Sequence, residues 1–198
     1  MGVSAKQERS KLRVATIIEA AHQILLTGNI DDITISNLAL HSGLKRTSTY
    51  KFFANLDDVK LLLVKRYLNE CSLEFGKSES ADFEEDLSGV MKESVLRIFN
   101  FFTINTGAQK IILNNTVSPS AESEDLHKIS SEVMKYIESE VQLPSMFNKD
   151  GVFLVIVQII ISIFSLNVKE NDELNDIGKT EAHRASYAYL LSCIAQKD

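Results

Sequence analysis

Six polar residues between positions 45 and 51 offer the positive charge and hydrogen-bond donors that bind nucleic acid. They are Lys45, Arg46, Thr47, Ser48, Tyr50 and Lys51. In the DNA major groove, Arg, Thr and Ser side chains can meet base edges, whereas Lys and Tyr commonly contact phosphates. A solvated face of an ordinary helix would have the same composition. Composition alone therefore does not indicate DNA binding; the flanking sequence must also predict a helix-turn-helix that holds the segment in position.

The preceding residues have the pattern of a short amphipathic helix. Its inward-facing residues are Ile35, Leu38 and Ala39. Thr34 is a suitable N-cap for a helix over residues 34–41, and Gly43 can adopt the left-handed conformation that ends it. We therefore predict a helix-turn-helix whose second helix, residues 45–53, enters the DNA major groove.

Separate roles for these residues can be assigned by analogy with other DNA-binding helices. We expect Arg46, Thr47 and Ser48 to meet base edges, and Tyr50 and Lys51 to touch phosphates. The remaining predicted contacts are Ser36 and Lys45. Ser36, near the start of the first helix, can reach the DNA backbone, and the Lys45 ammonium can point at a phosphate. Phe52 and Phe53 could anchor the second helix to a core.

Residues 13–64 resemble the DNA-binding domain of the TetR family of bacterial transcriptional regulators. The matching residues are Arg13, Ile17, Ala20, Ala21, Gly28, Ile33, Thr34, Leu38, Ala39, Gly43, Leu44, Tyr50, Phe53, Asn55 and Asp57. Lys45, Thr47 and Leu56 depart from the family pattern, and a Lys at the N-cap of the reading helix is a poor cap. The resemblance implies an all-α homodimer that binds a palindromic site in double-stranded DNA, acts as a repressor, and responds to an unidentified small-molecule effector.

Charge is distributed unevenly along the 198 residues. Residues 1–66 hold ten Lys/Arg against six Asp/Glu, whereas residues 67–198 hold eleven against twenty-one. A basic first third joined to an acidic remainder fits nucleic-acid binding confined to one end, although ordinary variation in surface charge would look the same.

Helical periodicity continues to the end of the chain, and few glycines and prolines interrupt it. We predict an all-α fold: a helix-turn-helix DNA-binding domain over residues 1–54, a connecting helix over 55–76, and a helical ligand-binding and dimerisation domain over 77–198. The expected helices cover about residues 11–27, 34–41, 45–53, 55–75, 82–104, 107–114, 122–141, 152–169 and 176–196. The turn-rich segment at residues 76–80 marks the domain boundary.

Two groups of residues in the second part have alternative interpretations. Met91, Phe99, Phe102 and Met134 could line an effector cavity or simply form core. Ile156, Ile160, Ile163, Phe164, Arg184, Tyr187, Ala188 and Leu191 could form a dimer contact or an intramolecular core. Because TetR-family proteins usually dimerise through their last two helices, the resemblance favours the dimer.

Other chemistry has little support in the sequence. The chain shows no nucleophile motif, phosphate-binding glycine loop or metal-ligand spacing, so we expect no enzyme activity, cofactor or metal site. Two Glu-x-x-His pairs, Glu19/His22 and Glu124/His127, fall in different domains and are not expected to converge on a metal.

The apolar run Val152 to Leu166 is shorter than the roughly 20 residues of a membrane-spanning helix. We therefore expect a buried core helix, no membrane partner and a cytoplasmic protein. The alternative function is a helical ligand-binding or protein-interaction module without sequence-specific DNA binding, which the departures at Lys45, Thr47 and Leu56 would favour.

Overall fold

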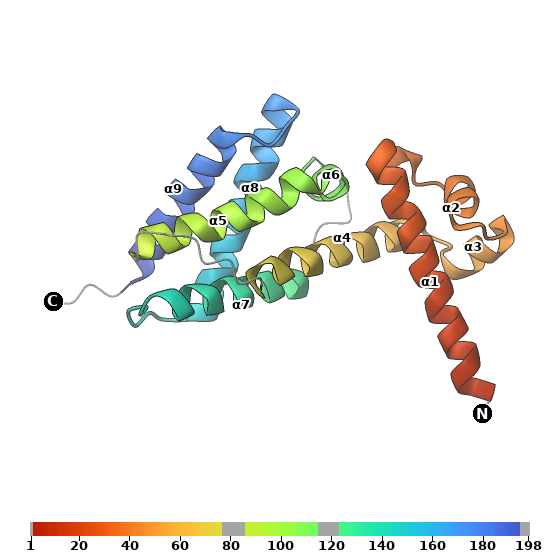
Figure 1. Ribbon diagram of the computed structural model, residues 1–198, viewed down its shortest axis with the longest axis horizontal. Coiled ribbons are helices and arrows are strands. Elements are labelled where there is room, and N and C mark those ends of the chain that lie inside the picture. The colour runs from red at the N-terminus through yellow and green to blue at the C-terminus, as the bar shows by residue number, and fades with distance from the viewer. Residues whose placement is uncertain (1, 77–85, 115–122, 195–198) are drawn as a thin grey trace.

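Helices make up most of the chain in the computed structural model, which describes residues 2–76, 86–114 and 123–194 (Figure 1). The α-helices are α1 (Gly2–Thr27), α2 (Ile35–Ser42), α3 (Arg46–Phe52), α4 (Leu56–Leu73), α5 (Leu87–Ile104), α6 (Thr106–Ala108), α7 (Ser123–Glu140), α8 (Lys149–Asn171) and α9 (Asp176–Cys193). Short 3-10 turns lie at Ile30–Asp32 (η1) and Glu74–Gly76 (η2), and a π-helical turn spans Gln109–Leu113 (η3). No strand occurs in these three ranges, which confirms the all-α prediction.

The first three helices form a head in which α1 packs on α2 and α4. The predicted start and end of α2 are confirmed: the Thr34 side chain accepts a hydrogen bond from the Asn37 amide at 3.2 Å, and Gly43 is left-handed with φ of 68°. Because glycine has no Cβ, it adopts this left-handed conformation at little cost and turns the chain sharply. The helix-turn-helix geometry is thus specified locally.

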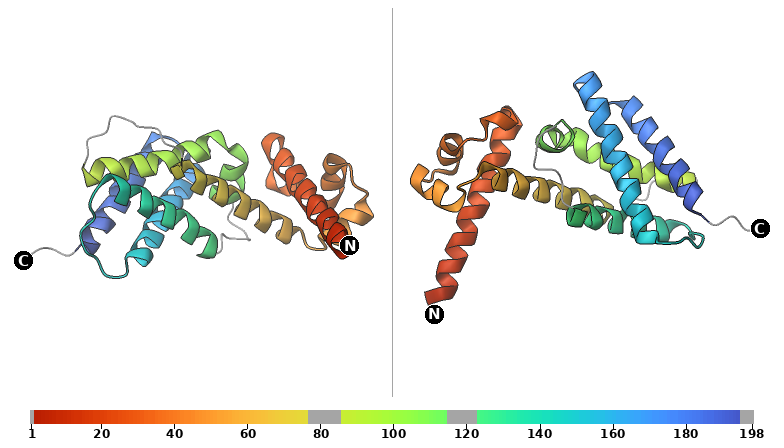
Figure 2. Two further views of the ribbon diagram at one scale, coloured as in Figure 1. Left: turned by 60° about the horizontal axis from the view of Figure 1, so that its bottom comes forward. Right: turned by 180° about the vertical axis from the view of Figure 1, so that it is seen from behind.

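Helix α4 runs from the head to the rest of the molecule (Figures 1 and 2). Asn55 caps it by accepting the Asp57 amide at 3.0 Å, and Asp57 and Asp58 lie in its first turn, where carboxylates favour the positive end of the helix dipole. Its far half packs on α7. The helix therefore contacts both the head and the body of the protein.

The body consists of α5 to α9, and α8 and α9 lie side by side at one edge in all views (Figures 1 and 2). By length and composition alone α8 could cross a membrane. Nine of its residues are buried, mostly aliphatic and aromatic side chains that include Phe153 and Phe164. Helix α8 packs against α7, α9 and η3, so this apolar helix lies in the protein core.

Several helix ends differ from the sequence prediction. Helix α1 begins at Gly2 rather than near residue 11, and its N-terminal part extends away from the other helices (Figure 1). Helix α8 begins and ends in polar residues, at Lys149 and Asn171, so the apolar run understated its length. The predicted start of the fifth helix at residue 82 and most of the domain boundary at 76–80 fall outside the described residues.

Candidate nucleic-acid interface

Most of the predicted DNA-contacting side chains are on the surface of α2, α3 and the turn between them. Those that are exposed are Ser36, Lys45, Arg46, Thr47, Tyr50 and Lys51, whereas Ser48 is half-buried. Within the described part of the chain, the side chains of Arg46, Thr47, Tyr50 and Lys51 have no hydrogen-bond or ion-pair partner. These donors are therefore available to a ligand.

The opposite face of α3 anchors it in the head. Thr49 is fully buried, and its hydroxyl donates to the Lys45 carbonyl at 3.3 Å. Phe53, directly after the helix, is also buried, while Phe52 is half-buried. Lys45 occupies the N-cap position, and its side chain makes no capping hydrogen bond, as predicted. A short helix held on one side and polar on the other can present its outer face to a groove.

The exposed face of α3 borders a shallow hollow of about 480 Å³ that also reaches α2. Its lining residues are Ile35, Arg46, Thr47 and Tyr50. Helical spacing predicted that Ile35 faces inward from α2, but the structure leaves it partly exposed beside Thr47. Ile35 lies in the first turn of α2, where fewer neighbouring helices cover an apolar side chain, so helical spacing alone did not reveal its position.

Comparison with known proteins gives a match at the level of structure only. No protein-family model matches the sequence, and no curated protein is detectably similar to it. A TetR-family transcriptional regulator from Streptomyces coelicolor superposes with a TM-score of 0.65 over 92% of this chain and 99% of its own, at 17% identity. The chain has the TetR-family fold.

Two further structures with this fold support the same assignment. The transcriptional repressor QsdR from R. erythropolis gives a TM-score of 0.61 at 13% identity, over 95% of this chain and 98% of its own. RolR in complex with resorcinol gives 0.59 at 13% identity, over 96% and 91%. The resemblance that the sequence showed over residues 13–64 thus extends, as a fold, through both parts of the chain.

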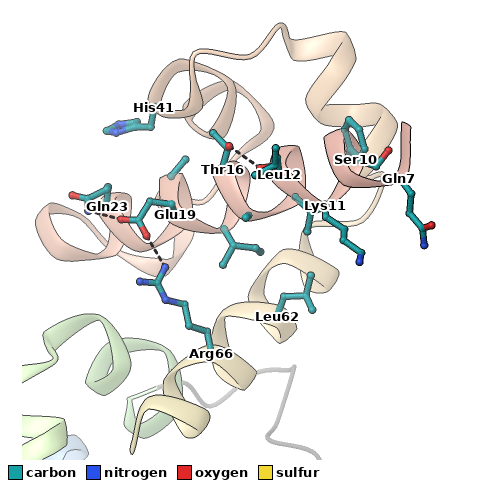
Figure 3. A pocket seen from close by; sticks show the side chains of 15 residues that line it. Gln7, Ser10, Lys11, Leu12, Thr16, Glu19, Gln23, His41, Leu62 and Arg66 are labelled. Carbon is teal, nitrogen blue, oxygen red and sulfur yellow. Dashed lines mark hydrogen bonds and ion pairs between the residues drawn. The ribbon is translucent and has the colours of Figure 1, made fainter. Parts of the chain in front are cut away.

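In this TetR-family fold, polar contacts join α1 of the head to the connecting helix α4. Arg66 of α4 donates to Glu19 at 2.7 Å beside a groove of about 1000 Å³ that is lined mainly by α1 (Figure 3). Hydrogen bonds from Gln23 and Arg66 hold the pKa of the Glu19 carboxyl below its ordinary value. The Tyr67 hydroxyl lies 2.7 Å from His22 Nδ1, and burial raises the pKa of Tyr67. These contacts fix α1 against α4.

A second junction comes from η3, which follows α6. The Lys110 ammonium donates to the carbonyls of Leu25 at 2.8 Å and Gly28 at 2.7 Å. Helix α1 has no basic residue in its last turn, so Lys110 supplies the positive charge that its C-terminal carbonyls favour. Further along the same turn, the Leu113 carbonyl accepts from Ser165 of α8 at 2.5 Å. The π-turn therefore contacts both α1 and α8.

Gly107 of α6 fits tightly into this junction. A Cβ at this position would lie 2.3 Å from the Tyr67 hydroxyl oxygen, and Tyr67 is fully buried. We expect Gly107→Ala to lower the free energy of unfolding by about 1–2 kcal/mol, because the extra methyl forces a packed side chain to move. Urea unfolding of the single variant and of Gly107→Ala in a Tyr67→Phe background tests this. An equal loss in both backgrounds would show that the clash with the hydroxyl is not the cause.

The four residues expected to line an effector cavity have different surroundings in the described part of the chain. Met91 and Phe102 are fully buried in the core, and Phe99 packs edge-to-face on Phe164 with ring centroids 5.9 Å apart. Met134 does line a cavity, of about 310 Å³, between α7 and α8. The other lining residues are His127, Ser130, Ser131, Asp150 and Phe153. Periodicity identified α7 and α8 but could not show where their surfaces leave space.

The residues expected at a dimer contact also divide into two groups. Ile156, Ile160 and Phe164 are fully buried within the single chain, so they belong to its own core rather than to an exposed face. Ile163 and Tyr187 are partly buried, whereas Arg184, Ala188 and Leu191 are exposed. Three apolar residues that were not predicted at this contact are exposed on the same two helices: Val155, Leu166 and Ile177.

The two Glu-x-x-His pairs have separate surroundings. Glu19 and His22 are engaged by Arg66 and Tyr67, as described above, and His127 lines the α7–α8 cavity. Across residues 2–76, 86–114 and 123–194, no group of three or more His, Cys, Asp or Glu side chains is arranged to hold a metal.

Proposed function

We propose that the chain is a TetR-type DNA-binding transcriptional regulator. One observation carries the proposal: α3 is anchored by buried Thr49 and Phe53 and presents unpaired Arg46, Thr47 and Tyr50 side chains to solvent. Residues 1–54 would bind DNA, residues 55–76 would connect, and residues 77–198 would bind an effector and dimerise. A bacterial regulator of this type acts on chromosomal DNA, so its proposed location is the cytoplasm. The proposed role needs no catalytic activity or cofactor.

A homodimer would present two copies of α3 to one face of the duplex. The two reading helices would then recognise a palindrome whose half-sites are about 34–36 Å apart, or a multiple of this distance. The proposed dimer contact lies on α8 and α9, with Val155, Leu166, Ile177 and Leu191 as its exposed apolar residues. Exposed apolar side chains on adjacent helices are suited to a homodimer interface.

The dimer contact can be tested with a charge substitution. We expect Leu166→Lys to raise the dimer dissociation constant by about tenfold, because Leu166 is 60% exposed and would place an ammonium in each half of an apolar interface. Sedimentation equilibrium measures this. The matched control is Leu73→Lys on α4, which changes a leucine of 59% exposure outside the proposed interface. Equal dissociation constants for the two variants would place the contact elsewhere.

We further propose that effector binding in the body regulates DNA binding. The α7–α8 cavity has a volume near the lower end of small-molecule sites, and its wall combines Met134 and Phe153 with two serine hydroxyls. RolR, which shares the fold, is bound to resorcinol, and QsdR is a repressor. By analogy this protein would be a repressor released by its effector. An effector shifts the equilibrium only through its different affinities for the DNA-bound and released conformations.

Two structural connections support such coupling. Helix α4 spans the head and the body, and Lys110 joins the C-terminus of α1 to a turn that also contacts α8. A movement of α8 can therefore reach the head through η3 and Lys110, or through α7, which packs on both α8 and α4. With two heads in one dimer, a small rotation of each changes the distance between the reading helices.

Selection of bound DNA from a random double-stranded library, with the full chain at near-physiological salt, tests the proposed function. Recovery of a palindrome supports a dimeric, sequence-specific regulator and supplies the operator for effector screening. Salt-sensitive binding without a consensus would indicate a nonspecific DNA-binding protein. If no DNA is retained, the alternative interaction module becomes the better description.

A further inference from the structure

The hollow between α2 and α3 has an apolar character that the predicted DNA contacts do not use. Ile35 lies on the α2 side and Thr47, which carries a methyl group, on the α3 side. Ile35 is partly exposed and is not among the apolar residues that pack against the protein core. An isoleucine in this position contributes little to the core, so its side chain is available to a ligand.

Polar groups surround the hollow and define the kind of ligand that fits. Arg46 and Tyr50 form part of its wall, and the exposed Lys45 and Lys51 lie on the same short segment. The Arg46 guanidinium has no partner among the described residues. This positive charge complements DNA phosphates and base acceptors rather than a purely apolar partner. The ligand must therefore offer an apolar group beside hydrogen-bond acceptors.

The edge of a DNA base pair in the major groove has this combination. Guanine presents the N7 and O6 acceptors that arginine binds with two hydrogen bonds, and thymine presents the C5-methyl group. The C5-methyl is the apolar feature by which thymine differs from the other bases in this groove. Because Thr47 directly follows Arg46, a base next to the one bound by Arg46 would lie over Ile35 and Thr47.

We propose that the part of the hollow lined by Ile35 and Thr47 receives the C5-methyl group of a thymine adjacent to the base pair that Arg46 contacts. Ile35 is then a specificity-determining residue, and each operator half-site contains a thymine at that position. The inference rests on the proposed DNA-binding function and extends it to the sequence that is read. Thr47 would act through its methyl group rather than its hydroxyl.

Replacement of single thymines by deoxyuridine in the selected operator tests this inference, since it removes only the C5-methyl. We expect one position per half-site to lower affinity by about fourfold, the value of one methyl group removed from water. Other thymines in the same duplex are the internal control. If no deoxyuridine substitution lowers the affinity, the inference is overturned while DNA binding remains intact. Failure to select any consensus would overturn it together with the proposed function.

Variants of the protein assign the methyl contact to these two side chains. Thr47→Ser keeps the hydroxyl and removes the methyl, and Ile35→Ala enlarges the hollow. Each should weaken binding to the thymine operator by about threefold to tenfold and have little further effect on the uridine operator. Thr27→Ser, an exposed threonine at the end of α1, is the matched control. Equal losses on both operators would mean that the side chains act through the fold and not through the methyl group.

Discussion

Replacement of Arg46 by alanine should weaken binding to the selected operator by about 10- to 100-fold and change binding to random DNA only slightly. Arg46 is exposed on the first turn of α3 and has no partner among the described residues, so its guanidinium can form two hydrogen bonds with guanine. Such a pair contributes about 1–3 kcal/mol of discrimination against the wrong base. Fluorescence anisotropy with operator and random duplexes at several salt concentrations measures both quantities.

Lys51→Ala is the matched control because it removes another exposed cation from the same helix. A lysine that contacts a phosphate should contribute equally to both duplexes and lower the salt dependence by about one counterion. We therefore expect parallel losses for Lys51→Ala and a selective loss for Arg46→Ala. Equal losses on both duplexes for Arg46→Ala would assign this arginine to the phosphate backbone.

Replacement of Lys110 by methionine should lower the free energy of unfolding by about 3 kcal/mol. Methionine retains the unbranched stem but cannot donate to the Leu25 and Gly28 carbonyls, which Lys110 reaches at 2.8 and 2.7 Å. Hydrogen bonds from a charged donor contribute about 1.5–3 kcal/mol each, and the two losses are not fully additive. Urea unfolding measured by circular dichroism gives the difference.

The control for this substitution is Lys135→Met on α7. Lys135 pairs with Glu132 at 2.8 Å on the surface, and exposed pairs of this kind contribute less than about 1 kcal/mol. If Lys110 connects the body to the head, its loss should also weaken operator binding by loosening the orientation of α1. A variant as stable as the control would show that water replaces the ammonium at the end of α1.

The sequence was sufficient to predict the features that depend on a few neighbouring residues. The Thr34 cap and the left-handed Gly43 are set within about three positions along the chain, and both were predicted correctly. The poor cap at Lys45 was predicted for the same reason. Together with helical periodicity, these local signals established the helix-turn-helix and the all-α class.

Features that depend on distant residues were not predictable. Lys110 contacts a carbonyl 85 positions away in the chain, and no local pattern indicates such a partner. Periodicity shows that Ile156 and Ile160 share a face of α8, but it cannot show whether a helix of the same chain covers that face. The partial exposure of Ile35 likewise depends on how α3 crosses α2. Assignments to core, dimer face and reading surface therefore required the three-dimensional structure.

The π-helical turn at Gln109–Leu113 determines in which direction the side chains of this segment point and how a homologous sequence aligns with it. The Asn114 amide donates to the Gln109 carbonyl at 3.0 Å, five residues back instead of four, so the turn contains one residue more than α-helical geometry needs. One residue corresponds to about 100° of rotation in an α-helix. Deleting it would turn the side chain at position 110 away from α1 while α8 still held the other end. A homologous sequence one residue shorter here should therefore lack the lysine as well.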